Sequence, residues 1–181
     1  MTFGATRVNG VLLVEPEPNR DERGFFARTF CEREFAAHGL VTRYPQCNVS
    51  YNRARFTLRG LHYAAPPARE EKLVRCTRGS IYDVILDLRA DSPTRFLWCA
   101  VELTENNHRM LYIPAGVAHG FLTLEEQTEV FYQMGASYVP DVARTVRWDD
   151  PGFGVKWPHE PALMSERDRA VPDFIGGPLT W

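Results

Sequence analysis

The sequence lacks the short motifs that mark several large classes of enzyme. It has no P-loop, no GxGxxG opening a helix and no GxSxG elbow, so nucleophilic hydrolase chemistry has no positive support. None of its four cysteines stands in a C-x-x-C pair, so the zinc-ribbon and thioredoxin signatures are missing. The H-x-H pair that is usual in two-histidine metal sites of β-barrels is missing as well.

Long apolar runs and an excess of positive charge are also missing. No window reaches the roughly 18 to 20 apolar residues of a membrane span, and the first residues do not form a basic stretch followed by an apolar one. We therefore expect a cytoplasmic protein with reduced thiols and no membrane partner. The net charge of −2 argues against a nucleic-acid binder, although the many arginines allow local positive pockets.

A chain of 181 residues predicts one domain, residues 1–181. Within it we expect N-terminal strands and a short helix over about residues 1–50 and the core over about residues 51–140. After Trp148 the sequence becomes irregular and rich in Trp and Pro. We expect this last segment, about residues 141–181, to pack back on the core.

Short segments with strand character recur along the chain, separated by Gly and Pro turns. They span residues 11–14, 25–30, 46–51, 56–63, 72–77, 80–88, 96–103, 110–113, 119–124 and 128–134. A short helix is predicted over residues 32–38, ended by Gly39, and a helix N-terminus at Ser165. The pattern predicts an all-β sandwich or barrel with short peripheral helices and an irregular C-terminal tail.

The stretch Arg59-Gly60-Leu61-His62-Tyr63 combines an anion-binding guanidinium with an imidazole that can move protons near neutral pH. Strict alternation would put Arg59 and His62 on opposite faces of a strand, so we expect a bulge at Gly60 to bring both into one pocket. His62 needs a carboxylate partner to act as a base, and Asp83, Asp87 or an aspartate of the tail could serve.

Two further side chains are candidates for the same chemistry. Tyr132 can donate a proton from its phenol, and its plainer interpretation is a half-buried strand tyrosine. Lys72 could place a positive charge beside a developing oxyanion, and its plainer interpretation is a solvated lysine at a strand edge.

Eight ordered segments resemble the dTDP-4-dehydrorhamnose 3,5-epimerase family of cupin-fold sugar-nucleotide epimerases, from about residue 11 to residue 168. They lie at residues 21–26, 46–50, 58–63, 72–76, 83–89, 92–94, 113–121 and 148–151. The resemblance implies a cupin jelly roll with no metal and no cofactor, working as a homodimer with a shared active site. It implies that a base removes a proton from C3 or C5 of a nucleotide-linked 4-keto-6-deoxyhexose and that an acid returns one to the opposite face.

The resemblance also implies a role for individual residues. His62 matches the base, Asp168 its carboxylate partner and Tyr132 the acid, while Lys72 matches the lysine that stabilises the enolate oxygen. The implied substrate-binding residues are Arg23, Phe26, Arg28, Gln46, Asn48, Arg59, His119, Tyr138 and Arg167. Of these, Arg59 and Arg23 match pyrophosphate binders, whereas Phe26 and Tyr138 match the nucleotide end.

The sequence departs from the family pattern at the nucleotide end. Arg28 and Ala143 stand where the family commonly has glutamate, so the nucleotide could be dTDP, CDP, GDP or another. Which of C3 and C5 inverts also stays open. Two other classes remain as alternatives: a metal-dependent cupin isomerase or dioxygenase, and a cupin that binds a nucleotide sugar without turnover.

Overall fold

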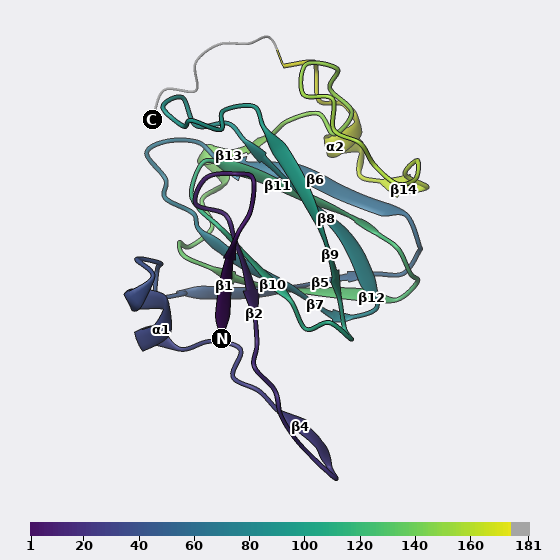
Figure 1. Ribbon diagram of the computed structural model, residues 1–181. Helices are drawn as coiled ribbons and strands as arrows, with labels where there is room; N and C mark the ends of the chain where they lie inside the picture. The colour runs from purple at the N-terminus through teal and green to yellow at the C-terminus, as the bar shows by residue number, and fades with distance from the viewer. Residues whose placement is uncertain (175–181) are drawn as a thin grey trace.

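Two β-sheets packed face to face form the body of the protein in the computed structural model, which describes residues 1–174 (Figure 1). The first sheet contains, in spatial order, β1 (Thr2–Ala5), β2 (Leu12–Glu15), β10 (Met110–Ile113), β7 (Lys72–Arg78), β12 (Thr128–Met134) and β5 (Gln46–Asn52). The second contains β13 (Ala143–Thr145), β6 (Thr57–Ala64), β11 (Val117–Thr123), β8 (Ser80–Asp87) and β9 (Trp98–Thr104), with β14 (Leu163–Met164) parallel to β6. This is a jelly-roll arrangement of antiparallel strands.

Short elements surround the two sheets. They are the hairpin of β3 (Asn19–Asp21) and β4 (Gly24–Phe26), the helices α1 (Glu32–Ala37) and α2 (Glu166–Arg169), and a 3-10 turn at Pro140–Val142. Figure 1 shows the β4 end of the hairpin projecting away from the sheets, on the side of the body opposite α2. Among the described residues, no helix is long and apolar enough to cross a membrane.

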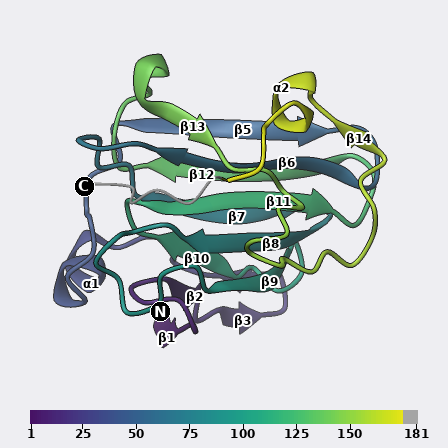
Figure 2. The same ribbon diagram turned by 90° about the horizontal axis from the view of Figure 1, so that it is seen from above.

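The β8 strand explains how the layers are held together. Its odd-numbered Ile81 and Ile85 lie in the core between the two sheets. Its even-numbered Val84 and Leu86 face the other way and are equally buried, because the C-terminal tail covers that face with Trp157 and other aromatic side chains. Alternation along β8 therefore divides its side chains between the two cores, and the C-terminal tail lies over the outer face of the second sheet (Figure 2).

One strand boundary is wrong in the sequence-based expectation for residues 25–30. The strand ends at Phe26, because the hairpin offers a partner only as far as Asn19. Phe30 instead packs against Phe35 of α1, with ring centroids 4.9 Å apart, on the outer face of the first sheet. The short strands β1, β3, β13 and β14 were not expected.

The bulge expected at Gly60 is confirmed. Along β11 and β6 the register shifts between His119, which pairs with His62, and Phe121, which pairs with Arg59. Gly60 has φ +139°, and a Cβ there would lie 2.5 Å from the Cα of Gly120, so the two strands approach too closely for a side chain. The extra residue turns Arg59 and His62 toward the same side of β6.

Candidate active site

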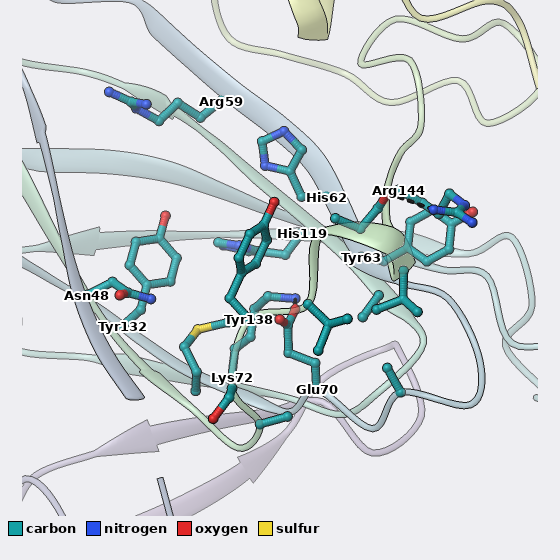
Figure 3. A pocket seen from close by; sticks show the side chains of 18 of the residues that line it. Asn48, Arg59, His62, Tyr63, Glu70, Lys72, His119, Tyr132, Tyr138 and Arg144 are labelled. Atoms are coloured by element: carbon teal, nitrogen blue, oxygen red, sulfur yellow. Dashed lines mark hydrogen bonds and ion pairs between the residues drawn. The ribbon is translucent and has the colours of Figure 1, made fainter. Parts of the chain in front are cut away.

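A cavity of about 320 Å³ opens between the two sheets, where β5, β7 and β12 face β6 and β11 (Figure 3). Its walls include eight of the side chains singled out from the sequence and several that were not. The eight that line it are Asn48, Arg59, His62, Lys72, His119, Tyr132, Tyr138 and Arg167 of α2. Proton donors, proton acceptors and cations therefore surround one space.

His62 meets Asp168 at this cavity across 106 residues of sequence. The imidazole Nε2 lies 2.7 Å from Asp168 Oδ1, and the carboxylate is buried while the imidazole is 43 % exposed. An ionised carboxylate accepts hydrogen bonds only, so Nε2 carries the proton and Nδ1 keeps the lone pair. The arrangement fixes the tautomer of the imidazole, and Nδ1 has no hydrogen-bond partner among residues 1–174.

The tail brings Asp168 to His62 through two local structures. Strand β14 runs parallel to the start of β6, with Met164 opposite Leu58. Ser165 then caps α2, its hydroxyl accepting a hydrogen bond from the Asp168 N–H at 3.1 Å. Asp168 is therefore held on the first turn of a capped helix beside β6.

The environment of the Asp168 carboxyl favours its charged form. Burial by itself raises the pKa of Asp168, but hydrogen bonds from His62, Ser165 and the Gly60 backbone outweigh it, and the net pKa is lowered. The carboxylate thus stays ionised beside His62, where it stabilises a protonated imidazole.

His119 and Asp83 form a second, deeper pair. His119 Nε2 lies 2.6 Å from Asp83 Oδ1, and the two side chains are 4 % and 0 % exposed. Burial raises the pKa of Asp83 more than His119 lowers it, and Asp83 Oδ2 is buried without a hydrogen-bond partner among the described residues. The third candidate, Asp87, binds Arg89, Ser92 and Thr94 instead.

Tyr132 of β12 lies against the second pair. Its ring meets His119 edge to face, with centroids 5.9 Å apart. Burial and the charge of Asp83 raise the pKa of Tyr132, against a smaller opposite effect of Arg59. The phenol therefore stays protonated at neutral pH and can act as a hydrogen-bond donor.

Arg59 is oriented by an asparagine that the sequence analysis did not consider. The Arg59 Nε donates to Asn52 Oδ1 at 2.7 Å, and Asn52 is 2 % exposed. The Asn52 amide nitrogen donates to the backbone carbonyls of Ser50 and Thr128, which fixes which way its oxygen faces. The guanidinium is thus directed, and its other N–H groups have no hydrogen-bond partner in the part of the chain that the structure describes.

Lys72 is not the solvated strand-edge lysine of the plainer interpretation. Its side chain is 8 % exposed and its Nζ lies 2.8 Å from Glu70 Oε1, also inside the cavity. The sequence analysis missed Glu70, although alternation places residues 70 and 72 on the same side of an extended chain.

Gln46 supports the cavity and does not line it. Its amide nitrogen donates to Asn48 Oδ1 at 3.1 Å, and its oxygen accepts from the Tyr138 N–H at 3.0 Å. Gln46 thereby ties the loop that carries Tyr138 to the β5 strand.

Three residues implied by the resemblance lie outside the cavity of their own chain. Arg23 and Phe26 are on the β3–β4 hairpin, where Phe26 is 81 % exposed and Arg23 pairs with Asp21. Arg28 pairs with Glu34 of α1, at 3.1 Å. Within one chain, these side chains cannot act together with His62.

Comparison with known proteins identifies the family. The dTDP-4-dehydrorhamnose 3,5-epimerase family model matches residues 5–175. The enzyme of that name from Pseudomonas aeruginosa is 42 % identical over 174 residues, covering 94 % of this chain and 95 % of its own. A Bacillus anthracis structure of such an epimerase with TDP and PPi bound has a TM-score of 0.91 at 37 % identity, covering 96 % and 99 % of the chains. A 3'-monoepimerase from Streptomyces bikiniensis in complex with dTDP-quinovose has a TM-score of 0.84 at 32 % identity, covering 93 % and 85 %.

Proposed function

The chain belongs to the dTDP-4-dehydrorhamnose 3,5-epimerase family, and we propose that it inverts C3, C5 or both of a nucleotide-linked 4-keto-6-deoxyhexose with His62 as the base. The observation that supports this assignment best is the His62–Asp168 pair facing the same cavity as Lys72 and Tyr132.

The proposed reaction begins with removal of a proton next to the C4 carbonyl. The carbonyl acidifies the hydrogens on C3 and C5, and His62 Nδ1 takes one of them while Asp168 stabilises the imidazolium. The electrons of the broken C–H bond move to the C4 oxygen and give an enolate. The Lys72 ammonium stabilises this oxyanion, as preorganised charge does in other enzymes.

The proposed second half returns a proton to the opposite face of the ring. Tyr132 supplies it, since its phenol is protonated at neutral pH and lies on β12, across the cavity from β6. The enolate collapses to the ketone with inverted configuration at the reacting carbon.

The diphosphate and the nucleotide complete the proposed substrate. Arg59, directed by Asn52, and Arg167 line the cavity, form no salt bridge within residues 1–174 and suit phosphate oxygens. Tyr138, 53 % exposed in the loop after β12, offers an aromatic face for a base. A thymidine diphosphate is our first choice, because TDP is bound in the B. anthracis relative.

We also propose that two copies share their active sites. The β3–β4 hairpin carries Phe26 and Arg23 away from its own body, and the edge strand β5 exposes Val49 and Tyr51. An exposed strand edge and apolar side chains of this kind are suited to association with a second copy. In such a dimer the hairpin of one chain would reach the cavity of the other. We place the enzyme in the cytoplasm, consistent with its four free thiols.

The function is tested by proton NMR of dTDP-4-keto-6-deoxyglucose incubated with the protein in D₂O. Loss of both the H3 and the H5 signals identifies a double epimerase, and loss of one identifies a mono-epimerase. If neither signal is lost with this or with the CDP and GDP analogues, the protein does not catalyse the reaction and the binding-only alternative takes its place.

The shared site is tested by mixing two inactive variants. His62→Ala removes the base, and Phe26→Ala with Arg23→Ala removes the contribution of the hairpin. Mixed dimers regain one intact site of two, so activity should reappear on mixing, whereas separate sites within each chain predict no recovery.

A further inference from the structure

The cavity contains a carboxylate for which the epimerase reaction proposed above has no role. Glu70 is 14 % exposed and its Oε1 lies 2.8 Å from Lys72 Nζ. In Figure 3 the two side chains lie together, with their charged ends toward each other and below His62. A carboxylate near a developing enolate opposes the new negative charge. Glu70 therefore cannot serve to stabilise the enolate and must have another role in the cavity.

The pair presents a hydrogen-bond donor beside an acceptor. A lysine ammonium has three N–H donors, and Glu70 takes up one, which leaves donors for a second oxygen. A carboxylate has room for about four hydrogen bonds, so Glu70 keeps acceptor capacity that faces the cavity.

A 4-keto sugar with a hydroxyl at C3 has the complementary pattern on neighbouring carbons. Its C4 carbonyl oxygen accepts, its C3 hydroxyl donates, and the spacing of two vicinal oxygens is comparable to the 2.8 Å between Nζ and Oε1. Resting on the proposed function, we infer that Glu70 accepts a hydrogen bond from the C3 hydroxyl while Lys72 donates to the C4 oxygen. Glu70 then selects α-hydroxy ketones over sugars that lack the C3 hydroxyl.

The selectivity follows from the cost of an unsatisfied buried acceptor. A sugar without the C3 hydroxyl leaves Glu70 with an unused, poorly solvated oxygen, and sites built around such a polar contact reject the analogue that lacks it. A hydroxyl at C2 does not have this relation to the C4 carbonyl, so its removal should matter less.

The test combines three substrates with three variants. The substrates are the 4-keto-6-deoxyhexose nucleotide, its 3-deoxy form and its 2-deoxy form. The variants are Glu70→Gln, which keeps the shape, Glu70→Ala, and the control Glu71→Gln. Glu71 is the neighbouring glutamate, lies outside the cavity lining and packs against Gly135. Deuterium incorporation is followed at the carbon that the wild type exchanges.

The wild type and Glu71→Gln should prefer the 3-hydroxy substrate over the 3-deoxy one by about tenfold or more in kcat/KM. Glu70→Ala should reduce this preference to about threefold or less, with Glu70→Gln in between. If the Glu70 variants lost kcat/KM equally on the 3-hydroxy and the 3-deoxy substrates, Glu70 would act only by holding Lys72. The inference would then be wrong. The inference would also be wrong if the Glu70 variants lost a preference for the full substrate over its 2-deoxy form instead of over its 3-deoxy form.

A binding measurement separates this inference from the proposed reaction. The C4-reduced sugar nucleotide cannot be epimerised, and calorimetry gives its affinity with and without the C3 hydroxyl. If the wild type exchanges no hydrogen, the reaction is refuted, but a preference for the 3-hydroxy ligand that Glu70→Gln removes still supports the contact. Equal affinities for the two ligands in the wild type overturn the contact, whatever the catalytic result.

Discussion

The two histidines that line the cavity each pair with an aspartate, at almost the same distance but in very different surroundings. His62 and Asp168 are 2.7 Å apart at the edge, and His119 and Asp83 are 2.6 Å apart between the sheets. Their carboxyl pKa values move in opposite directions, lowered for Asp168 and raised for Asp83.

The difference comes from the other partners of each carboxylate. Asp168 receives hydrogen bonds from Ser165 and the Gly60 backbone in addition to His62, which compensates the loss of water. Asp83 is fully buried and its second oxygen has no partner among the described residues, so His119 alone must compensate for burial.

The contrast shows that the distance within a histidine–aspartate pair does not determine the direction of the carboxyl pKa shift. The lowered pKa keeps Asp168 ionised beside His62 at the edge of the cavity. Burial instead disfavours the charge of Asp83, which lies beside a His119 whose ring meets Tyr132 edge to face. We therefore expect changes to the outer pair to reduce catalysis and changes to the inner pair to reduce stability.

The largest effect is expected from removing the base of the outer pair. His62→Ala should lower deuterium exchange at both carbons by about a thousandfold, since general-base catalysis contributes roughly 10²–10⁴. The thermal midpoint should change little because His62 is nearly half exposed. Near-wild-type exchange in D₂O would show that another group removes the proton.

The matching change in the inner pair is Asp83→Asn, which leaves the buried His119 without its carboxyl partner. We expect a loss of about 2–3 kcal/mol in the free energy of unfolding, measured in urea. Asp168→Asn is the control, and it should lose less than about 1 kcal/mol because its partner is solvated. If both variants lost the same stability, burial would not distinguish the pairs.

The pH dependence of stability should have opposite signs for the two aspartates. The folded pKa of Asp83 is raised, so the wild type should gain stability relative to Asp83→Asn as the pH falls from that raised pKa toward the ordinary 3.8. The folded pKa of Asp168 is lowered, so the wild type should lose stability relative to Asp168→Asn as the pH falls from 3.8 through that lowered pKa. Urea midpoints across the acid range measure both slopes, and slopes of the same sign would contradict the assignment.

The smallest effect is expected at the cap of α2. Ser165→Ala removes the hydroxyl that accepts from the Asp168 N–H and should cost about 1 kcal/mol. Since α2 carries both Asp168 and Arg167, exchange should also slow by several-fold. Ser165→Asn restores a capping acceptor and should recover most of the stability and most of the exchange rate. If Ser165→Asn lost as much stability and exchange as Ser165→Ala, the effect would not come from the cap.

Much of the fold was accessible from the sequence because local periodicity reflects which face of a strand is buried. The core strands and the short helix at residues 32–37 agree with the prediction to within a few residues. The bulge at Gly60 could be predicted for the same reason, because alternation places Arg59 and His62 on opposite faces unless a residue is inserted.

Alternation could not predict which aspartate pairs with each histidine. Asp83, Asp87 and a tail aspartate were equal candidates for His62, and only the resemblance favoured Asp168. The choice depends on β14 running beside β6 and on β8 lying next to β11, and both are contacts between distant parts of the chain.

The sequence by itself therefore determined the strands, their buried faces, and the presence of an imidazole, a phenol and cations in the segments that line the cavity. The tertiary structure decided which groups meet: Asp168 with His62, Asp83 with His119, Glu70 with Lys72, and the hairpin of Arg23 and Phe26 with none of them. The physical reason is that alternation depends on the next few residues, whereas a pKa or an ion pair depends on atoms within a few ångströms, which the packing of the two sheets and the tail brings together.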